Sequence, residues 1–196
     1  MIAGENLPEN GTICLVAAGA NLTSPFGAPR ATLRKALQLL GERVGVIRRV
    51  SQFYRTPAFP RGAGPDFVNA VACVASDLPP ERILEHLHGI EADAGRVRGA
   101  RWAARSLDLD LVAVADQVCP DPATHEKWAS LSPERQITET PDTLILPHPR
   151  LPDRAFVLVP LAEIAPDWRH PVLGLTVREM RDRLPREALE EVTALQ

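Results

Sequence analysis

The hydrophobic residues of this chain fall into short apolar runs separated by longer amphipathic segments. Residues 13–18 are a continuous apolar run, typical of a strand buried on both faces, and residues 67–75, apolar except for Asn69, indicate another strand. Residues 44–54 alternate apolar with polar side chains, which indicates a strand buried on one face. Residues 107–114 form a further apolar run that two aspartates interrupt at alternate positions. The pattern therefore predicts four strands.

Two amphipathic helices are expected between these strands. Residues 28–42 carry apolar side chains at the spacing i, i+3, i+4 and i+7, which places them on one face of a helix. A second helix is expected to open at Pro79 and Pro80, with Asp77 as its cap, and to end near Gly95. The order β-α-β-β-α-β predicts an α+β, ferredoxin-like fold, an antiparallel four-stranded sheet with both helices on one face.

The pattern becomes irregular in the last part of the chain. Residues 116–143 are rich in Pro, Asp, Glu and Thr, and we interpret them as an insertion or long loop with one short helix near 123–131. Regular segments return as two expected helices at 156–164 and 176–184. These helices would form a C-terminal extension of the sheet domain.

The length of 196 residues suits one domain with a sizeable core. We expect a flexible leader at 1–11, a single domain at 12–185 and a C-terminal tail at 186–196. The chain contains 45% hydrophobic and 24% charged residues, which is ordinary for a soluble globular protein.

Charge and cysteine content narrow the possible partners and the compartment. A net charge of −3 argues against a broad nucleic-acid surface, and no apolar run reaches the about 18 residues of a membrane span. Cys14, Cys73 and Cys119 lie far apart without a Cys-x-x-Cys pair, which favours a reduced protein over a disulfide scaffold. We therefore expect a cytoplasmic monomer whose partners are small molecules, with neither nucleic acid nor a membrane.

Asp108 and Asp110 are the strongest candidates for chemistry. Side chains two apart on a strand share a face, so the two carboxylates would stand side by side, about 6 to 7 Å apart at Cα. Like charges this close repel unless a cation lies between them, and nucleotide-bound Mg²⁺ takes both carboxylate and phosphate oxygens. The plainer interpretation is a pair of solvated carboxylates with arginine partners, but the nearby arginines outnumber the two carboxylates. They are Arg96, Arg98, Arg101 and Arg105.

Other chemical motifs are missing or weak. The chain has no phosphate loop of the form G-x-x-x-x-G-K-[ST] and no His-Glu-x-x-His zinc motif. His86 and His88 lie two apart on an expected helix and do not share a face, so they would chelate a metal poorly and should face solvent. We keep open that His88 reaches a cleft beside Glu91.

Four separated segments carry a more specific set of motifs. They read Gly-Ala-Asn-Leu at 19–22, Ser-Gln-Phe-Tyr-Arg-Thr-Pro at 51–57, Gly-Arg-Val-Arg at 95–98 leading to Arg-Trp-Ala-Ala-Arg-Ser-Leu-Asp-Leu-Asp at 101–110, and Leu-Pro-His-Pro-Arg-Leu-Pro-Asp-Arg-Ala-Phe at 146–156 followed by Pro-Leu-Ala-Glu-Ile-Ala-Pro at 160–166. In this order the segments resemble the 6-hydroxymethyl-7,8-dihydropterin pyrophosphokinase family. The resemblance covers roughly residues 12–185, and the third segment is the most specific.

The resemblance implies a reaction and its metal. The family transfers the diphosphate group of ATP to the hydroxymethyl oxygen of 6-hydroxymethyl-7,8-dihydropterin in folate biosynthesis, and AMP is released. By resemblance, Asp108 and Asp110 would hold two Mg²⁺ ions that bridge the ATP phosphates, and Arg96 and Arg105 would be catalytic. Such transfer depends mostly on positioning and charge neutralisation. The implied ATP contacts are His88, Glu91, Arg98, Trp102, His148 and Arg154.

The resemblance also implies a pterin site. Phe67 and Phe156 would stack on the two faces of the ring, and the amide of Asn69 would hydrogen-bond its edge. Taken alone, such phenylalanines are more often core residues, and such an asparagine is as well explained as a buried amide with its own partners. The full set implied for the pterin is Thr56, Pro57, Phe59, Phe67, Asn69 and Phe156.

Two other classes of function stay open. A different Mg²⁺-dependent nucleotidyltransferase or phosphotransferase would also use paired aspartates, but nucleotidyltransferases place a Gly-Ser element shortly before them, whereas Gly19 is far from Asp108. A non-catalytic ferredoxin-like module that binds RNA or a regulatory ligand would favour lysines around aromatic side chains. The chain has only two lysines, Lys35 and Lys127.

Overall fold

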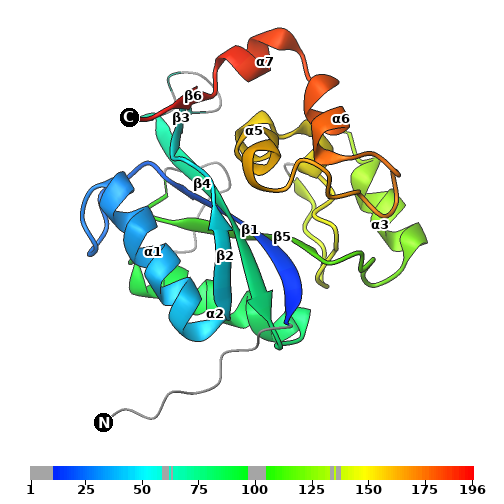
Figure 1. The fold of residues 1–196 in the computed structure, drawn as a ribbon, viewed down its shortest axis with the longest axis horizontal. Helices are drawn as coiled ribbons and strands as arrows, with labels where there is room; N and C mark the ends of the chain where they lie inside the picture. Colours follow the sequence, from blue (N-terminus) through cyan, green and yellow to red (C-terminus); the bar gives the residue numbers. More distant parts are fainter. Residues whose placement is uncertain (1–10, 59–61, 63, 97–104, 133–134, 136–137) are drawn as a thin grey trace.

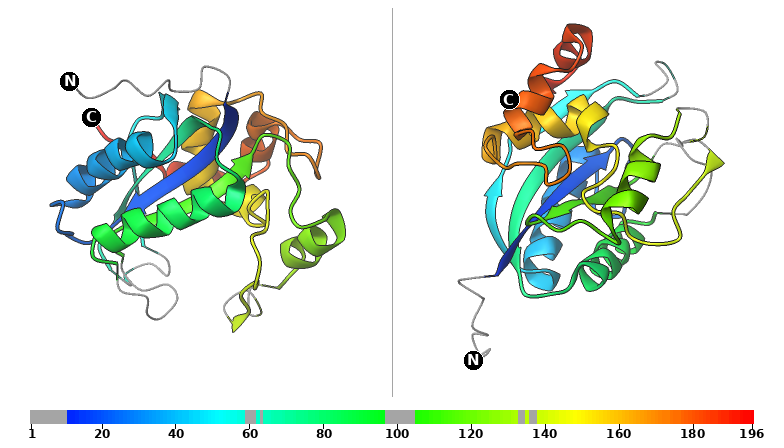
Figure 2. Two further views of the ribbon diagram at one scale, coloured as in Figure 1. Left: turned by 90° about the horizontal axis from the view of Figure 1, so that it is seen from below. Right: turned by 90° about the vertical axis from the view of Figure 1, so that its right-hand side faces the viewer.

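The computed structural model describes the chain apart from residues 1–10, 59–61, 63, 97–104, 133–134 and 136–137. The leader expected at 1–11 therefore lies almost wholly outside the described residues. The described part is a mixed α/β structure in which helices cover both faces of an antiparallel sheet (Figure 1 and Figure 2).

The sheet has β1 and β4 at its centre. Its order is β5-β1-β4-β3-β6, and β2 also pairs with β4, on the edge that β3 shares. Every pair is antiparallel. The strands are β1 (Thr12–Ala20), β2 (Val46–Val50), β3 (Tyr54–Thr56), β4 (Phe67–Ser76), β5 (Asp108–Val114) and β6 (Thr193–Ala194).

The strand predicted at 44–54 is divided into β2 and β3, so the prediction of one continuous strand is wrong. The chain bends at Ser51, which is buried. The N–H of Ser51 donates to the carbonyl of Val71 at 2.9 Å, and the N–H of Val71 donates to the Ser51 hydroxyl at 3.0 Å. Because a side chain replaces a backbone acceptor here, the regular ladder stops and the chain can turn.

The two helices predicted between the strands are confirmed. They are α1 (Pro29–Arg43) and α2 (Pro80–Asp93), which pack on the same face of the sheet, α1 against β1 and β4 and α2 against β5. The cap predicted at Asp77 is wrong, because Pro79 is the N-cap of α2 and no side chain caps that end. Two prolines near the helix start supply the fixed φ that a helix needs without a side-chain cap.

The opposite face of the sheet is covered by α5 (Ala155–Ile164) and α6 (Val177–Asp182), which correspond to the two C-terminal helices predicted. A second apolar core forms there between the sheet and these helices. The sheet therefore has an apolar core on each of its two faces.

The region 116–143 contains α3 (Pro122–Ala129), which agrees with the short helix predicted near 123–131. Asp121 caps this helix by accepting the N–H of Thr124 at 2.9 Å. A short 3₁₀ helix, η1 (Leu151–Asp153), then leads into α5. The region 116–143 thus lies between β5 and the segment that begins α5.

Residues 186–196, expected to be a tail, contain α7 (Arg186–Glu190) and β6. β6 pairs with β3, and the N–H of Leu195 donates to the carbonyl of Phe53 at 2.7 Å. A two-residue strand is too short to show a hydropathy period, so the pattern did not predict it. Among the described helices, none combines the length and apolarity that a membrane crossing requires.

Candidate active site

β5 presents Asp108 and Asp110 on the sheet face opposite α1 and α2. The alternating residues Leu107, Leu109 and Leu111 are buried in the core that those helices form, whereas both aspartates are half-buried. Alternate side chains of a strand point to opposite faces. The strand therefore holds both carboxylates on one face, with a rigid apolar support behind them.

Three arginines pair with these carboxylates. Nη1 of Arg96 lies 2.7 Å from Oδ1 of Asp108, and Arg105 pairs with Oδ2 of the same aspartate. Nη1 of Arg154 donates to Oδ2 of Asp110 at 2.5 Å. Burial alone would raise the pKa of Asp110, but the Arg154 guanidinium lowers it to about 2. The carboxylate of Asp110 is thus charged across the physiological range.

The end of α2 positions Arg96. Gly95 has a φ of 71°, a left-handed conformation that glycine adopts at helix ends, so the predicted end near Gly95 is confirmed. The N–H of Arg96 then donates to the carbonyl of Glu91 at 3.0 Å, and its guanidinium pairs with the Glu91 carboxylate. The same carboxylate accepts the N–H of Leu109 at 2.7 Å. Glu91 therefore connects α2, Arg96 and β5.

Glu91 is buried, with 4% of its surface exposed. Burial raises the pKa of this carboxyl to about 7, although the N–H of Leu109 and the Arg96 guanidinium both favour its charged form. Because Oε1 of Glu91 accepts from both Arg96 and the N–H of Leu109, Glu91 fixes the position of Arg96 relative to β5.

The motif at 19–22 positions Arg105. Oδ1 of Asn21 accepts the N–H of Arg105 at 2.7 Å, while the N–H groups of Asn21 and Leu22 donate to the carbonyl of Arg105 at 3.0 and 3.2 Å. Nδ2 of Asn21 donates to the carbonyl of Pro65 at 3.1 Å. Asn21 was not among the predicted site residues. The signal that could have identified it is its place in the first matched motif, at 19–22.

His148 lies in the segment that follows the insertion. Its N–H donates to the carbonyl of Val112 at 2.7 Å, and its Nδ1 accepts the N–H of Arg150 at 3.1 Å. Burial and the Arg154 guanidinium lower the pKa of His148 to about 3, against the opposing effect of Asp110. The network therefore assigns a neutral ring whose proton is on Nε2, which makes Nε2 a donor.

The aromatic and amide residues expected at the pterin lie beside these carboxylates. Asn69 is buried on β4, and its Nδ2 donates to Oγ1 of Thr56 on β3 at 2.8 Å. Phe67 opens β4 and is half-buried. Phe156, in the first turn of α5, is 39% exposed, and the guanidinium carbon of Arg154 lies 5.6 Å from the centre of its ring. Arg154 thus connects the aromatic group with the carboxylates of β5.

Gly19 of β1 lies between the aromatic and amide residues of β4 and the carboxylates of β5. It is paired with Asn69 of β4 on one side and with Asp108 of β5 on the other. Neighbouring strands are about 4.8 Å apart, so the backbones of Asn69 and Asp108 are about 10 Å apart across one row of the sheet. A Cβ on Gly19 would lie 2.8 Å from Oδ1 of Asn69. Only the register of the sheet reveals why this position is glycine.

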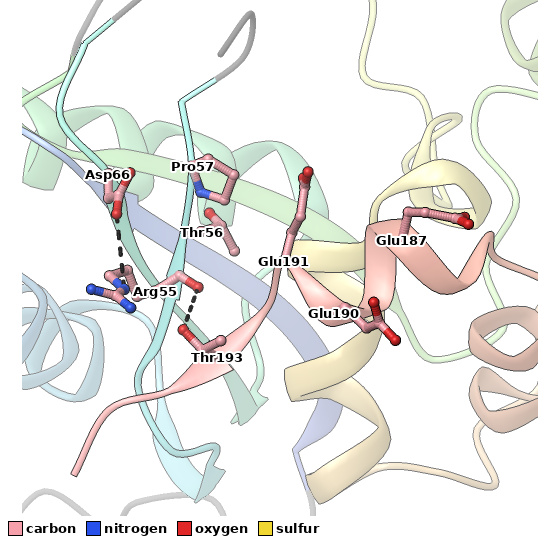
Figure 3. A pocket seen from close by; sticks show the side chains of 8 residues that line it. All are labelled: Arg55, Thr56, Pro57, Asp66, Glu187, Glu190, Glu191 and Thr193. Carbon is pink, nitrogen blue, oxygen red and sulfur yellow. Dashed lines mark hydrogen bonds and ion pairs between the residues drawn. The ribbon is translucent and has the colours of Figure 1, made fainter. Parts of the chain in front are cut away.

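Thr56 and Pro57 line a cavity of about 440 Å³ between β3 and the C-terminal segment (Figure 3). Arg55 lies 3.8 Å from the carboxylate of Asp66, and the hydroxyl of Thr193 donates to the carbonyl of Arg55 at 3.4 Å. Three glutamates of the C-terminal segment form the other wall of this cavity. The sequence patterns did not predict that these glutamates would face Thr56 and Pro57. The whole lining is Arg55, Thr56, Pro57, Asp66, Glu187, Glu190, Glu191 and Thr193.

The structure places the remaining predicted residues less centrally or not at all. Phe59, Arg98 and Trp102 lie outside the described residues. His88 is exposed on the surface of α2, as expected for a histidine facing solvent. His86 is half-buried, so the expectation that both histidines face solvent holds only for His88.

Glu163 near the end of α5 is a further residue that the predictions missed. Its carboxylate accepts the N–H of Gln52 at 3.0 and 3.2 Å and the hydroxyl of Tyr54 at 3.1 Å. Nη1 of Arg49 donates to the carbonyl of Ile164 at 2.9 Å. These bonds join α5 to the bend that leads into β3.

The donor chemistry of Asp108 and Asp110 fits Mg²⁺. Mg²⁺ prefers hard oxygen ligands and is often bound by one or two carboxylates, with substrate phosphates and water completing its shell. Both carboxylates are half-buried and face the same way, so their oxygens suit such an ion. The three arginines beside them supply the planar donors that suit phosphate.

Comparison with known protein families gives one match over most of the chain. A family model described as 7,8-dihydro-6-hydroxymethylpterin-pyrophosphokinase matches residues 15–166. Three relatives, each named 2-amino-4-hydroxy-6-hydroxymethyldihydropteridine pyrophosphokinase, are similar over nearly the whole chain. They come from Synechocystis (32% identity, 93% of this chain and 82% of the relative), Methylorubrum extorquens (37%, 87% and 95%) and Pseudomonas aeruginosa (34%, 90% and 94%).

Solved structures show similarity at the level of the fold. The crystal structure of wild-type Plasmodium falciparum HPPK-DHPS superposes with a TM-score of 0.63 at 16% sequence identity. The matched region covers 92% of this chain and 45% of that one. This chain therefore corresponds to less than half of that protein, and the similarity concerns the arrangement of helices and strands.

Proposed function

This chain belongs to the 7,8-dihydro-6-hydroxymethylpterin-pyrophosphokinase family, and from that premise we propose how its own residues carry out the reaction. The enzyme uses ATP, with Mg²⁺, to transfer a diphosphate group to 6-hydroxymethyl-7,8-dihydropterin in folate biosynthesis, and it releases AMP. The observation that carries the assignment of residues is the pair of carboxylates on β5 with three arginines around them.

The reaction exchanges one phosphorus–oxygen bond for another. The hydroxymethyl oxygen of the pterin forms a bond to the β-phosphorus of ATP, and the bond from that phosphorus to the oxygen shared with the α-phosphate breaks. The electron pair leaves with AMP, and the hydroxyl proton is released. Because the transferred group is highly charged, the protein contributes mostly by orienting the two substrates and neutralising charge.

Asp108 and Asp110 would hold the metal, for which we propose two Mg²⁺ ions. When bound with ATP, Mg²⁺ supplies charge neutralisation at the phosphate oxygens and fixes their orientation. The present pairing of Arg96 and Arg105 with Asp108, and of Arg154 with Asp110, balances the carboxylate charge. On ATP binding we expect these guanidinium groups to exchange carboxylate for phosphate partners, which frees the carboxylates for the metal.

The other nucleotide contacts surround this group. The neutral ring of His148 offers Nε2–H to a phosphate oxygen, and Glu91 acts by holding Arg96 in place. By similarity to the family, His88, Arg98 and Trp102 complete the nucleotide site.

The pterin would bind at the Asn69 end of the same sheet row. We assign the stacking on its ring to Phe67 of β4 and Phe156 of α5, which the exposure of Phe156 supports, since it fits a ligand-binding role better than a core role. Asn69 and Thr56 supply polar groups for its edge, with Pro57 and Phe59 contributing backbone groups. The amide of Asn69 is held by Thr56 and can therefore present a fixed orientation.

The finer architectural assignments follow from the same premise. We propose that the topology is ferredoxin-like, which is supported by the order β5-β1-β4 with β2 and β3 both on β4, when β6 is set aside and β2 and β3 are taken as one divided strand. We assign residues 12–185 to one catalytic domain with an insertion at 116–143, and residues 186–196 to a C-terminal segment that joins the same sheet through β6. We also propose that the enzyme acts as a cytoplasmic monomer without nucleic acid, which its free cysteines Cys14, Cys73 and Cys119 suit.

The direct test is the appearance of AMP when the purified chain is mixed with ATP, Mg²⁺ and the reduced hydroxymethylpterin. AMP should form only when all three are present, and Asp110→Asn should abolish it. Asp116→Asn, which removes an exposed carboxylate outside this group, should leave the rate unchanged. Formation of pyrophosphate or ADP instead of AMP would point to a nucleotidyltransferase or another phosphotransferase, and nucleotide binding without turnover would point to a binding module.

A further inference from the structure

Two buried histidines lie outside the carboxylate group, between the insertion and the C-terminal extension. His125 belongs to α3 and is 2% exposed, and His170 belongs to the loop before α6 and is fully buried. Their rings meet edge to face, with centres 5.6 Å apart and planes at 65°. Figure 1 shows α3 beside the loop that leads into α6. The pair therefore joins segments that are 45 residues apart.

The hydrogen bonds of His170 determine which nitrogen carries its proton. Nδ1 accepts the N–H groups of Val172 and Leu173, each at 3.2 Å. A nitrogen that accepts two N–H bonds has no proton of its own, so the proton of the neutral ring is on Nε2. His170 therefore has one remaining group, a buried Nε2–H donor.

His125 has the complementary arrangement. Its Nε2 lies 3.0 Å from the carbonyl oxygen of Pro147. A carbonyl oxygen can only accept, so Nε2 carries the proton and Nδ1 is a bare acceptor. The contacted carbonyl belongs to the residue immediately before His148, whose own N–H donates to Val112 of β5.

The two remaining nitrogens form a matched pair. Nδ1 of His125 and Nε2 of His170 are both buried, and neither has a hydrogen-bond partner in the described part of the chain. One is an acceptor and the other a donor, on rings that already touch. An unpaired buried polar group costs about 1–3 kcal/mol, so a hydrogen bond between these two nitrogens would be favourable.

We propose that His170, His125 and the carbonyl of Pro147 form a hydrogen-bonded chain that holds the His148 segment in position for the ATP phosphates. The two histidines are thus positioning residues, and the insertion serves to carry one of them. The inference rests on the proposed role of His148 as a nucleotide contact.

Neighbouring contacts support this role for the cluster. Nε1 of Trp168 donates to the carbonyl of Ala115 at 3.0 Å, where β5 ends, and the Trp168 ring packs edge to face against His170. Cys119 and Leu146 exchange two backbone hydrogen bonds, which join the start of the insertion to the His148 segment. Burial lowers the pKa of both histidines, that of His170 to about 4, so both rings stay neutral and keep their assigned protons.

The test compares two replacements of His125 that differ in which ring nitrogen they imitate. His125→Gln places an amide donor near the position of Nε2 and can keep the bond to Pro147, whereas His125→Asn imitates Nδ1 and loses it. The readout is the dissociation constant of Mg²⁺ with a non-hydrolysable ATP analogue, measured by calorimetry. We expect His125→Asn to weaken binding by about tenfold, and His125→Gln to restore most of it. His86→Asn, a histidine on α2 outside the cluster, is the matched control.

His170 supplies a second, independent arm. His170→Asn keeps an acceptor for the N–H groups of Val172 and Leu173 but removes Nε2, so it should weaken nucleotide binding without unfolding the loop. It also carries the test if His125→Asn does not fold. Nitrogen-15 spectra of the imidazole rings provide the structural readout, and both rings should be neutral with the proton on Nε2.

The outcomes separate the inference from the proposed function. Folded His125→Asn and His170→Asn variants that bind the analogue as tightly as the unmodified protein would overturn the positioning role, as would a proton on Nδ1 of His125. Equal loss of affinity for a pterin analogue would also overturn it, because the chain contacts only the phosphate side. An unmodified protein that binds no nucleotide would instead overturn the proposed function.

Discussion

Gly19 of β1 is paired with Asn69 of β4 so closely that a Cβ on the glycine would lie 2.8 Å from Oδ1 of the asparagine. The Asn69 amide cannot easily move away, because it is buried and donates to Thr56 at 2.8 Å. The other neighbour of Gly19 in the sheet is Asp108. This small residue thus lies between the residue proposed to bind the pterin and the residue proposed to bind the metal.

Gly19→Ala should therefore impair the enzyme through the orientation of Asn69. We expect the KM for the pterin to rise by about tenfold, with a smaller change for ATP, because the loss of one buried hydrogen bond has about this effect. Steady-state kinetics with each substrate varied will measure both. Gly41→Ala in α1 is the control, since a Cβ there makes only ordinary contact with Ile47 at 3.8 Å. An unchanged pterin KM in Gly19→Ala would contradict the assignment of Asn69.

Asp110→Asn should abolish turnover while leaving the fold intact. The substitution keeps the shape of the side chain and removes the charge that we propose binds the metal, so we expect a loss of about a thousandfold or more in kcat. Thermal unfolding followed by circular dichroism will show whether the fold persists. Near-normal turnover at saturating Mg²⁺ would count against the metal role of Asp110.

Phe156→Ala should weaken pterin binding with little effect on stability. The side chain is 39% exposed, so its truncation leaves no large cavity in the core. Loss of a stacking face should raise the pterin KM by about tenfold. Val172→Ala, which truncates an equally exposed apolar side chain in the loop before α6, is the control. A large fall in stability with an unchanged KM would assign Phe156 to packing instead.

Asn21→Ala should reduce activity through Arg105. The Asn21 side chain accepts the N–H of Arg105 at 2.7 Å and donates to Pro65 at 3.1 Å, so its removal leaves the Arg105 backbone less firmly held. We expect kcat to fall by about tenfold, consistent with a misplaced phosphate-binding arginine. Asn21→Asp keeps the acceptor and should retain more activity than Asn21→Ala. Equal activities of the two variants would show that the bond to Arg105 does not matter.

The buried His170 should make stability depend on pH. Its pKa is lowered from 6.5 to about 4, mainly by burial, so below pH 6.5 the unfolded chain binds a proton that the folded chain resists. Stability from this group is therefore complete above pH 6.5 and is lost as the pH falls to about 4, by up to about 3 kcal/mol. Urea unfolding at pH 7 and pH 4.5 will measure the loss, which should be smaller in His170→Asn. Equal losses in both proteins would contradict the neutral buried state.

Local patterns predicted most of the fold correctly. The apolar runs and the helical spacing indicate β1, β4, β5, α1 and α2 because buried strands and amphipathic helices each have a characteristic period over a few residues. The same reasoning places Asp108 and Asp110 on one face of β5, since that depends only on the alternation of a strand. The matched motifs then identify the family.

Local patterns could not predict contacts between segments that are distant in the sequence. The division of the strand at Ser51 depends on Val71, and the strand β6 exists only because β3 offers a free edge. Likewise Asn21 and Arg105 are 84 residues apart, and nothing local indicates that one holds the other.

Short-range periods and motifs were sufficient to predict β1, β4, β5, α1 and α2, the paired carboxylates of Asp108 and Asp110, and the family to which the chain belongs. Three relationships became visible only in the folded structure: Glu91 pairs with Arg96, Gly19 lies between Asn69 and Asp108, and His125 packs against His170. The physical reason is that sheet register and packing bring together residues whose positions along the chain are unrelated. Orientation and charge balance in the site depend on those distant contacts.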